Sequence, residues 1–130
     1  MITPIYASVL ALLFVILSIR TIRVRRKYKV GVGDGNKEAL KRAMRVHANF
    51  AEYVPLSIIL LYFLESTLLK TEMGYDVWVH VLGGLLVTGR VLHAYGVSQS
   101  RENLKFRVTG MAMTFIVMIA TAISLLVVYV

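Results

Sequence analysis

The C-terminal stretch "VTGMAMTFIVMIATAISLLVVYV", residues 108–130, contains no charged side chain. At about 1.5 Å per helical residue, it is long enough to cross the roughly 30 Å hydrocarbon layer of a bilayer. The N-terminal stretch "MITPIYASVLALLFVILSI", residues 1–19, is also free of charge. The chain of 130 residues is 58% hydrophobic and 17% charged, a composition typical of an integral membrane protein.

Two further apolar segments, residues 50–69 and 77–97, lie between these ends. The charged residues and histidines within them are Glu52, Glu65, His80, Arg90 and His93. Each segment is long enough to form a membrane span. The sequence therefore predicts an all-α integral membrane protein, with one domain over residues 1–130 built as a four-helix bundle. The predicted transmembrane helices cover about residues 3–29, 37–69, 76–98 and 105–129.

Basic residues gather in two of the three predicted loops. Ten of the 15 Lys and Arg residues lie between Arg20 and Arg45 with two acids, and four lie between Arg90 and Arg107 with one acid. The second loop, residues 65–76, has one lysine and three acids. The positive-inside rule then places the first and third loops in the cytoplasm and both termini outside. A cleaved signal peptide is not expected, because the positive charge follows the first apolar segment.

Composition also excludes several kinds of chemistry. The chain has no cysteine, which excludes disulfides, a cysteine nucleophile and thiolate metal ligands, so any reactive thiol must come from a substrate.

The glycines of "VGVGDGN", residues 30–36, follow no strand and lack a phosphate-loop lysine, so they predict a turn. No metal site is predicted. The net charge of +8 favours contact with anionic membrane lipids, and no nucleic-acid partner is expected for a bilayer-embedded chain.

The segment "RAMRVHANFAEY", residues 42–53, places polar side chains where the second helix enters the membrane. At about 100° per residue, four of them fall within about 80° of one another, and a fifth lies at the edge of the same stripe. These residues are Arg42, Arg45, Asn49, Glu52 and, at the edge, Tyr53. Ionisable groups at this depth are costly and usually face a partner helix or a wet cavity. A structural clamp between helices and a binding site are both open interpretations.

Arginines from the next two helices are expected at the same membrane level. Arg90 lies near the cytoplasmic end of the third predicted helix, and Arg107 begins the fourth. An excess of guanidinium groups suits a partly buried anion, because arginine binds carboxylates in a bidentate manner. In the third helix, Gly83, Gly84 and Gly89 are expected to let neighbouring backbones approach closely, which favours oligomerisation.

The stretch "RAMRVHANFAEYVPL", residues 42–56, resembles the R-x-x-R-x-x-x-N-x-x-E-Y-x-P-L signature of the MAPEG family. These are the membrane-associated proteins in eicosanoid and glutathione metabolism. "GRVLHAYG", residues 89–96, and the arginine that opens the fourth helix extend the resemblance over nearly the whole chain. The resemblance is to a bacterial-type member and implies a homotrimer of four-helix bundles in the inner membrane. Glutathione would bind as a co-substrate between adjacent subunits near the cytoplasmic side.

The resemblance also implies binding roles. The residues that match glutathione-holding positions are Arg45, Asn49, Glu52 and Tyr53, with Arg42 as a basic neighbour. Glu52 would accept a hydrogen bond from the amino group of the tripeptide, and the arginines would bind its carboxylates. Arg90 is expected to join them. His93 and Tyr95 fall where eukaryotic glutathione-using members have tyrosines, and are predicted to contribute further contacts.

Arg107 matches the arginine of the family that lies near the glutathione sulfur and favours the reactive thiolate, with Arg101 as the competing candidate. The implied function is a glutathione transferase or peroxidase acting on lipophilic electrophiles. The alternative is a non-enzymatic lipid- or anion-binding membrane protein that uses the same pocket. A small exporter is disfavoured, because residues 1–19 contain no carboxylate. No chemistry is expected of His47 or His80.

Overall fold

The computed structural model describes residues 1–69 and 76–130, and within them the chain forms four α-helices and no strand. The helices are α1 (Thr3–Tyr28), α2 (Glu38–Leu68), α3 (Asp76–Ser98) and α4 (Leu104–Tyr129). Each is long and apolar enough to cross a membrane, and the predicted integral membrane fold is confirmed. The helix ends lie within one residue of the predicted ones. The acidic second loop lies largely outside the described residues.

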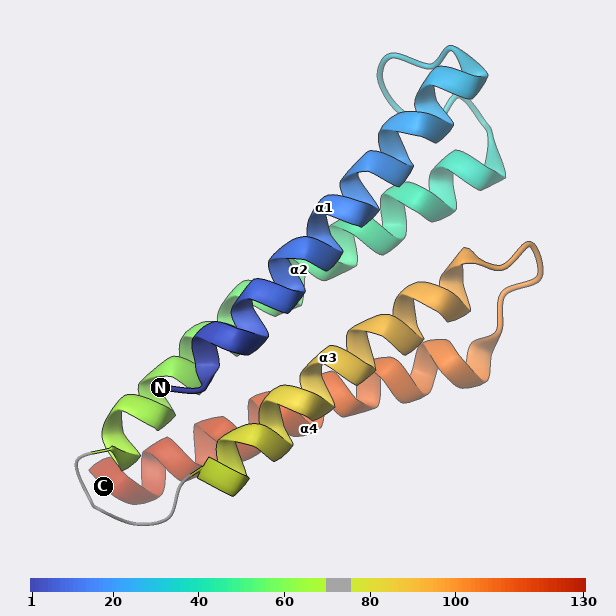
Figure 1. Cartoon of the computed structure of the whole chain (residues 1–130). Coiled ribbons are helices and arrows are strands. Elements are labelled where there is room, and N and C mark those ends of the chain that lie inside the picture. The colour runs from blue at the N-terminus through green and yellow to red at the C-terminus, as the bar shows by residue number, and fades with distance from the viewer. Residues whose placement is uncertain (70–75) are drawn as a thin grey trace.

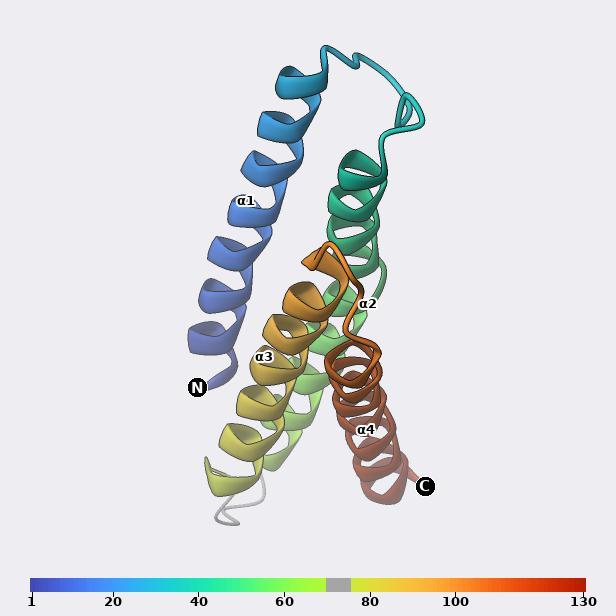
Figure 2. The ribbon, with the colours of Figure 1, turned by 90° about the vertical axis from the view of Figure 1, so that its right-hand side faces the viewer.

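The four helices form two antiparallel hairpins, α1 with α2 and α3 with α4 (Figure 1). Both termini lie at one end of the bundle, and the two basic loops, residues 29–37 and 99–103, lie at the other end. The hairpins are close together at the terminal end and separate toward the basic loops, as Figures 1 and 2 show from two sides. α2 contacts all three other helices, whereas α1 and α4 share no contact in the described part of the chain.

The start of α1 is capped from a distant part of the sequence. Its N-cap residue, Ile2, provides no side-chain cap, and the first turn contains no acid. Instead, the carboxylate of Glu65 in α2 accepts hydrogen bonds from the backbone N–H groups of Ile2 and Thr3, the latter at 2.9 Å. The side chain of Glu65 is 0% exposed. Because a helix N-terminus has unpaired N–H groups and favours negative charge, this cap stabilises a carboxylate inside a membrane span.

Glycines bring α3 close to two other helices. A Cβ atom on Gly89 would lie 2.9 Å from the backbone oxygen of Gly110 in α4. Gly83 lies against the ring of Tyr6 in α1, whereas nothing lies within 4 Å of a Cβ on Gly84. Within the chain, the predicted close approach is therefore confirmed for Gly89 but not for Gly84, because successive residues point about 100° apart around a helix.

Candidate functional site

The polar face of α2 consists of an exposed edge and a buried seam. At the exposed edge, Arg45 Nη1 lies 3.1 Å from Glu52 Oε1 and Nη2 lies 3.4 Å from Oε2. These side chains are 56% and 45% exposed, and Arg42 lies half-buried about one turn before them. An exposed ion pair contributes only about 0 to 1 kcal/mol. A bound ligand can therefore replace either partner at small cost.

Asn49 begins the buried seam, where it pairs with an arginine from α3. Arg90 is 1% exposed, and its Nη2 donates a hydrogen bond to Asn49 Oδ1 at 2.7 Å. Both of its terminal nitrogens also lie 3.9 Å from the sulfur of Met111 in α4. Within the described residues, its Nε has no partner. A buried guanidinium is costly unless it is paired, so Asn49 is its main support.

His93 lies one turn after Arg90 and is also buried. It packs against α4, where a Cβ atom on Gly110 would lie 2.8 Å from His93 Cβ. Arg107 lies one turn before Gly110, and Asn49, the partner of Arg90, lies one turn after Arg45. The Nδ1 atom of His93 has no hydrogen-bond partner in the part of the chain that the structure describes. The structure thus brings together five of the predicted site residues from three helices, at the end of the bundle that has the basic loops: Arg45, Asn49, Arg90, His93 and Arg107.

Arg107 is positioned by the packing of the first turn of α4 against the end of α3. The backbone N–H of Asn103 donates to the Gly96 carbonyl at 3.0 Å, and a Cβ on Gly96 would lie 2.6 Å from the backbone nitrogen of Arg107. The guanidinium of Arg107 also forms an ion pair with Glu102 at 2.6 Å. Arg101 lies exposed in the preceding loop. The geometry therefore favours Arg107 over Arg101 as the cation beside His93.

The two predicted tyrosines differ in their placement. The ring of Tyr53 packs edge-on against Phe115 of α4, with centroids 5.5 Å apart, and Tyr53 thus lies where α2 meets α4. Tyr95 is exposed, and its ring packs against Phe106. Because it follows His93 by two residues, it points about 200° away around α3. Within one chain, Tyr95 is not brought to the other predicted residues.

The histidines outside the cluster pair with α1. His47 Nε2 lies 3.0 Å from Ser18 Oγ, and its ring stacks on Phe14 with centroids 4.7 Å apart. His80 Nδ1 lies 2.8 Å from the hydroxyl of Tyr6. Across residues 1–69 and 76–130, no group of three or more His, Asp or Glu side chains could hold a metal ion. Both histidines thus join helices, and neither lies in the arginine cluster.

The structure adds residues to the site that sequence patterns do not assign to it. They are Gly96, Glu102, Gly110 and Met111. The two glycines do give a signal, since small residues in an apolar span indicate close helix packing. Glu102 precedes its helix, so helical spacing does not connect it with Arg107. Nothing in the sequence marks Met111 as a site residue, because methionine is an apolar residue in an apolar span.

Comparison with known proteins finds matches that cover nearly the whole chain, including the candidate site. The model of the MAPEG family matches residues 3–127, which include every candidate site residue. The chain is 35% identical over 116 residues to the inner membrane protein YecN of Escherichia coli strain K12, a match that covers 88% of this chain and 82% of that protein. The inner membrane protein YecN of Escherichia coli O6:H1, strain CFT073, matches with the same identity and coverage.

Proposed function

The chain belongs to the MAPEG family, and we propose on this basis that it is a membrane-bound, glutathione-dependent transferase for lipophilic electrophiles. Glutathione is the co-substrate and binds between the subunits of a homotrimer, at the end with the basic loops. The protein lies in the bacterial inner membrane, as the name of its relatives indicates for them, with both termini outside the cytoplasm. The observation that supports this proposal is the arginine cluster, which the Asn49–Arg90 hydrogen bond and the packing of His93 on Gly110 bring together from three helices.

The charge of this cluster suits glutathione. Its charged members are Arg45, Arg90 and Arg107 with the glutamates Glu52 and Glu102, and Arg42, one turn before Arg45, adds a fourth arginine. The cluster therefore has an excess of two positive charges. Glutathione has two carboxylates and one ammonium group, so its thiolate form has two net negative charges. Binding would neutralise the cluster, and arginine favours carboxylates through bidentate hydrogen bonds.

The ion pair on α2 can recognise the zwitterionic end of glutathione. When the pair opens, Arg45 binds the carboxylate of that end and Glu52 accepts from its ammonium group. One exposed ion pair is thereby exchanged for two, at little cost for the opening. Asn49 and Arg90 remain paired behind them at 2.7 Å and form the rigid back of the site.

Arg107 supplies the charge that the reaction needs. A fixed cation beside the sulfur favours the thiolate over the thiol, and the thiolate is the nucleophile. The thiolate attacks the electrophilic carbon, a C–S bond forms, and the leaving group departs with its bonding electrons. An apolar electrophile reaches the sulfur laterally from the bilayer along α4, whose exposed side chains include Val108, Phe115 and Ile116.

Conjugation of glutathione to an aryl halide by the purified protein tests this proposal. We expect Arg107→Ala to lower the rate about a hundredfold while glutathione binding is partly retained. Arg101→Ala, the matched control in the adjacent loop, should change the rate little. Glutathione titration should raise the ultraviolet absorbance of the thiolate, and Arg45→Ala should abolish that rise. Unchanged conjugation in Arg107→Ala would exclude Arg107 as the activator.

One observation favours a second candidate, a non-enzymatic lipid- or anion-binding protein that uses the same pocket. The ion pair between Arg107 and Glu102, at 2.6 Å, partly neutralises the cation that would activate the thiol. This candidate predicts saturable glutathione binding, or copurification of a lipid, with no thiolate absorbance and no turnover of any electrophile.

A further inference from the structure

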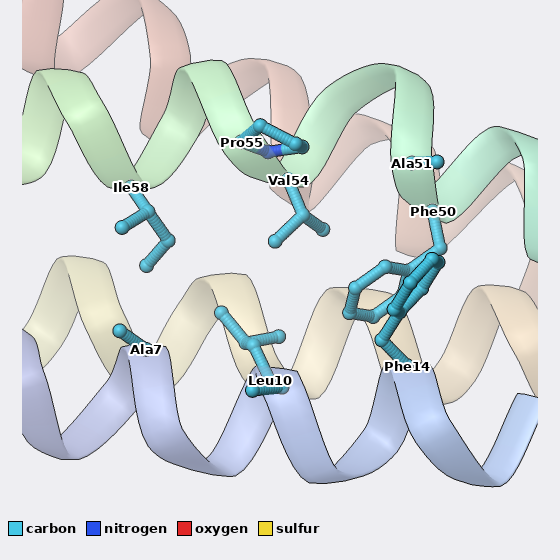
Figure 3. Close-up of a pocket in the computed structure, with 9 residues that line it drawn as sticks. Ala7, Leu10, Phe14, Phe50, Ala51, Val54, Pro55 and Ile58 are labelled. Carbon is cyan, nitrogen blue, oxygen red and sulfur yellow. The ribbon is translucent and has the colours of Figure 1, made fainter.

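A groove follows the α1–α2 pair on the opposite face of α2 from the arginine cluster. Its first hollow has a volume of about 260 Å³ and an apolar lining. Figure 3 shows Leu10 and Phe14 of α1 facing Phe50, Val54 and Ile58 of α2 across it. The hollow lies at the depth of the apolar part of α1, inside the hydrocarbon layer.

Two further hollows lie along the same face of the α1–α2 pair toward the basic loops, beyond the contacts of His47 with Phe14 and Ser18. One of about 390 Å³ is lined by residues that include Ser18 and Arg25. The next, of about 420 Å³, shares Arg25 with it and adds Arg26 and Lys29. From Ala7 to its C-cap residue Lys29, α1 lines the three hollows at steps of about three and four residues, which is a single stripe of the helix. The groove is therefore apolar at one end and basic at the other.

We propose that this groove binds one anionic phospholipid, with its phosphate at Arg25, Arg26 and Lys29 and an acyl chain in the hollow at Ala11. The rise from Ala11 to Arg25 is about 21 Å, at about 1.5 Å per residue. Half of a bilayer, headgroups included, is about 20 to 22 Å thick. One lipid of the leaflet next to the basic loops therefore spans the groove from its charged end to its apolar end.

The charge of the groove favours an anionic lipid as its occupant. None of the residues that line the three hollows, all within the described part, has a carboxylate. The basic end of the groove at Arg26 and Lys29 therefore has no acidic partner in its own lining. An anionic headgroup is attracted there, by about 1 kcal/mol for each basic side chain.

Native mass spectrometry of the full-length chain in detergent tests the headgroup site. The probes are phosphatidylglycerol and phosphatidylcholine with identical acyl chains. We expect one phosphatidylglycerol per chain, bound at least about tenfold more tightly than phosphatidylcholine. Arg26→Gln combined with Lys29→Asn should weaken phosphatidylglycerol binding about thirtyfold. Arg23→Gln, which removes an exposed cation of α1 outside the groove, should weaken it much less.

Two tryptophan variants test the acyl-chain site. Ala11→Trp fills the first hollow and should displace the lipid, whereas Ala112→Trp, at an exposed alanine of α4, should not. Thermal unfolding of the unmodified chain gives a test that needs no variant, because only a bound lipid raises the midpoint. Phosphatidylglycerol should raise it and phosphatidylcholine should not. The proposal would be overturned if both lipids bound equally, or if Ala11→Trp retained its lipid in full. It would also be overturned if that variant formed a smaller oligomer while keeping its lipid.

Discussion

Replacing Asn49 by leucine removes the oxygen that supports a buried cation, with little change in side-chain volume. Arg90 is 1% exposed and donates to Asn49 Oδ1 at 2.7 Å, and the sulfur of Met111 is 3.9 Å away. A hydrogen bond to a charged group contributes about 1.5 to 3 kcal/mol, and removing one partner of a buried charge costs about 3 to 5 kcal/mol. We expect Asn49→Leu to lower the free energy of unfolding by about 3 kcal/mol. That loss raises the unfolding equilibrium constant about a hundredfold.

Unfolding in mixed micelles with increasing sodium dodecyl sulfate, followed by far-ultraviolet circular dichroism, measures this loss. The control is Asn49→Leu combined with Arg90→Met, which removes the charge together with its acceptor. A buried polar pair replaced by apolar side chains is often neutral in stability, so the double variant should recover about 2 kcal/mol or more. It should still fail to bind glutathione. Equal stability of the single and double variants would refute the dependence of Arg90 on Asn49.

Three further changes test other parts of the fold and site. Glu65→Ala should lower the free energy of unfolding by about 2 kcal/mol, because the N–H groups of Ile2 and Thr3 lose their cap. The control Glu38→Ala, at an exposed carboxylate, should lower it by less than about 1 kcal/mol. Similar losses in the two variants would argue against the cap. Gly96→Ala should reduce thiolate absorbance and conjugation by displacing the first turn of α4, and Gly84→Ala should change neither, since its Cβ meets open space. Cysteine labelling with an impermeant maleimide tests the topology. Val32→Cys, at a loop position 94% exposed, should be labelled only in opened cells, whereas a cysteine appended to the C-terminus should be labelled in intact spheroplasts. The reverse pattern would invert the topology.

The helices could be predicted because the bilayer imposes length and polarity on each span. Residues 108–130 contain no charge, and the glycine-rich residues 30–36 interrupt the helical pattern, so spans and turns are both visible. α2 continues through Pro55, although proline removes a hydrogen bond within the helix. A bilayer penalises every unpaired backbone group. Losing one hydrogen bond therefore costs less than ending the helix inside the membrane.

The partners of the polar groups could not be predicted in the same way. Periodicity shows that Asn49 and Glu52 share a face of α2, but not which helix that face meets. In the structure, Asn49 lies against α3, while Glu52 remains at the edge with its partner on α2. The cap formed by Glu65 on Thr3 joins positions 62 residues apart. Within one chain, Tyr95 packs against Phe106 and points away from His93, so its contact with glutathione between subunits stays a prediction.

For the proposed glutathione site, the exposure of the ion pair on α2 makes assembly a condition of binding. Arg45 and Glu52 are 56% and 45% exposed, and they lie near the level where α2 enters the hydrocarbon layer. A single chain therefore leaves its candidate site open to lipid and water, which weakens the electrostatic attraction for a bound tripeptide. The phospholipid groove differs, because α1 and α2 of one chain form all of it. Dissociation into monomers should consequently abolish thiolate formation and leave phosphatidylglycerol bound, and loss of both together would show that the two sites depend on the same interface.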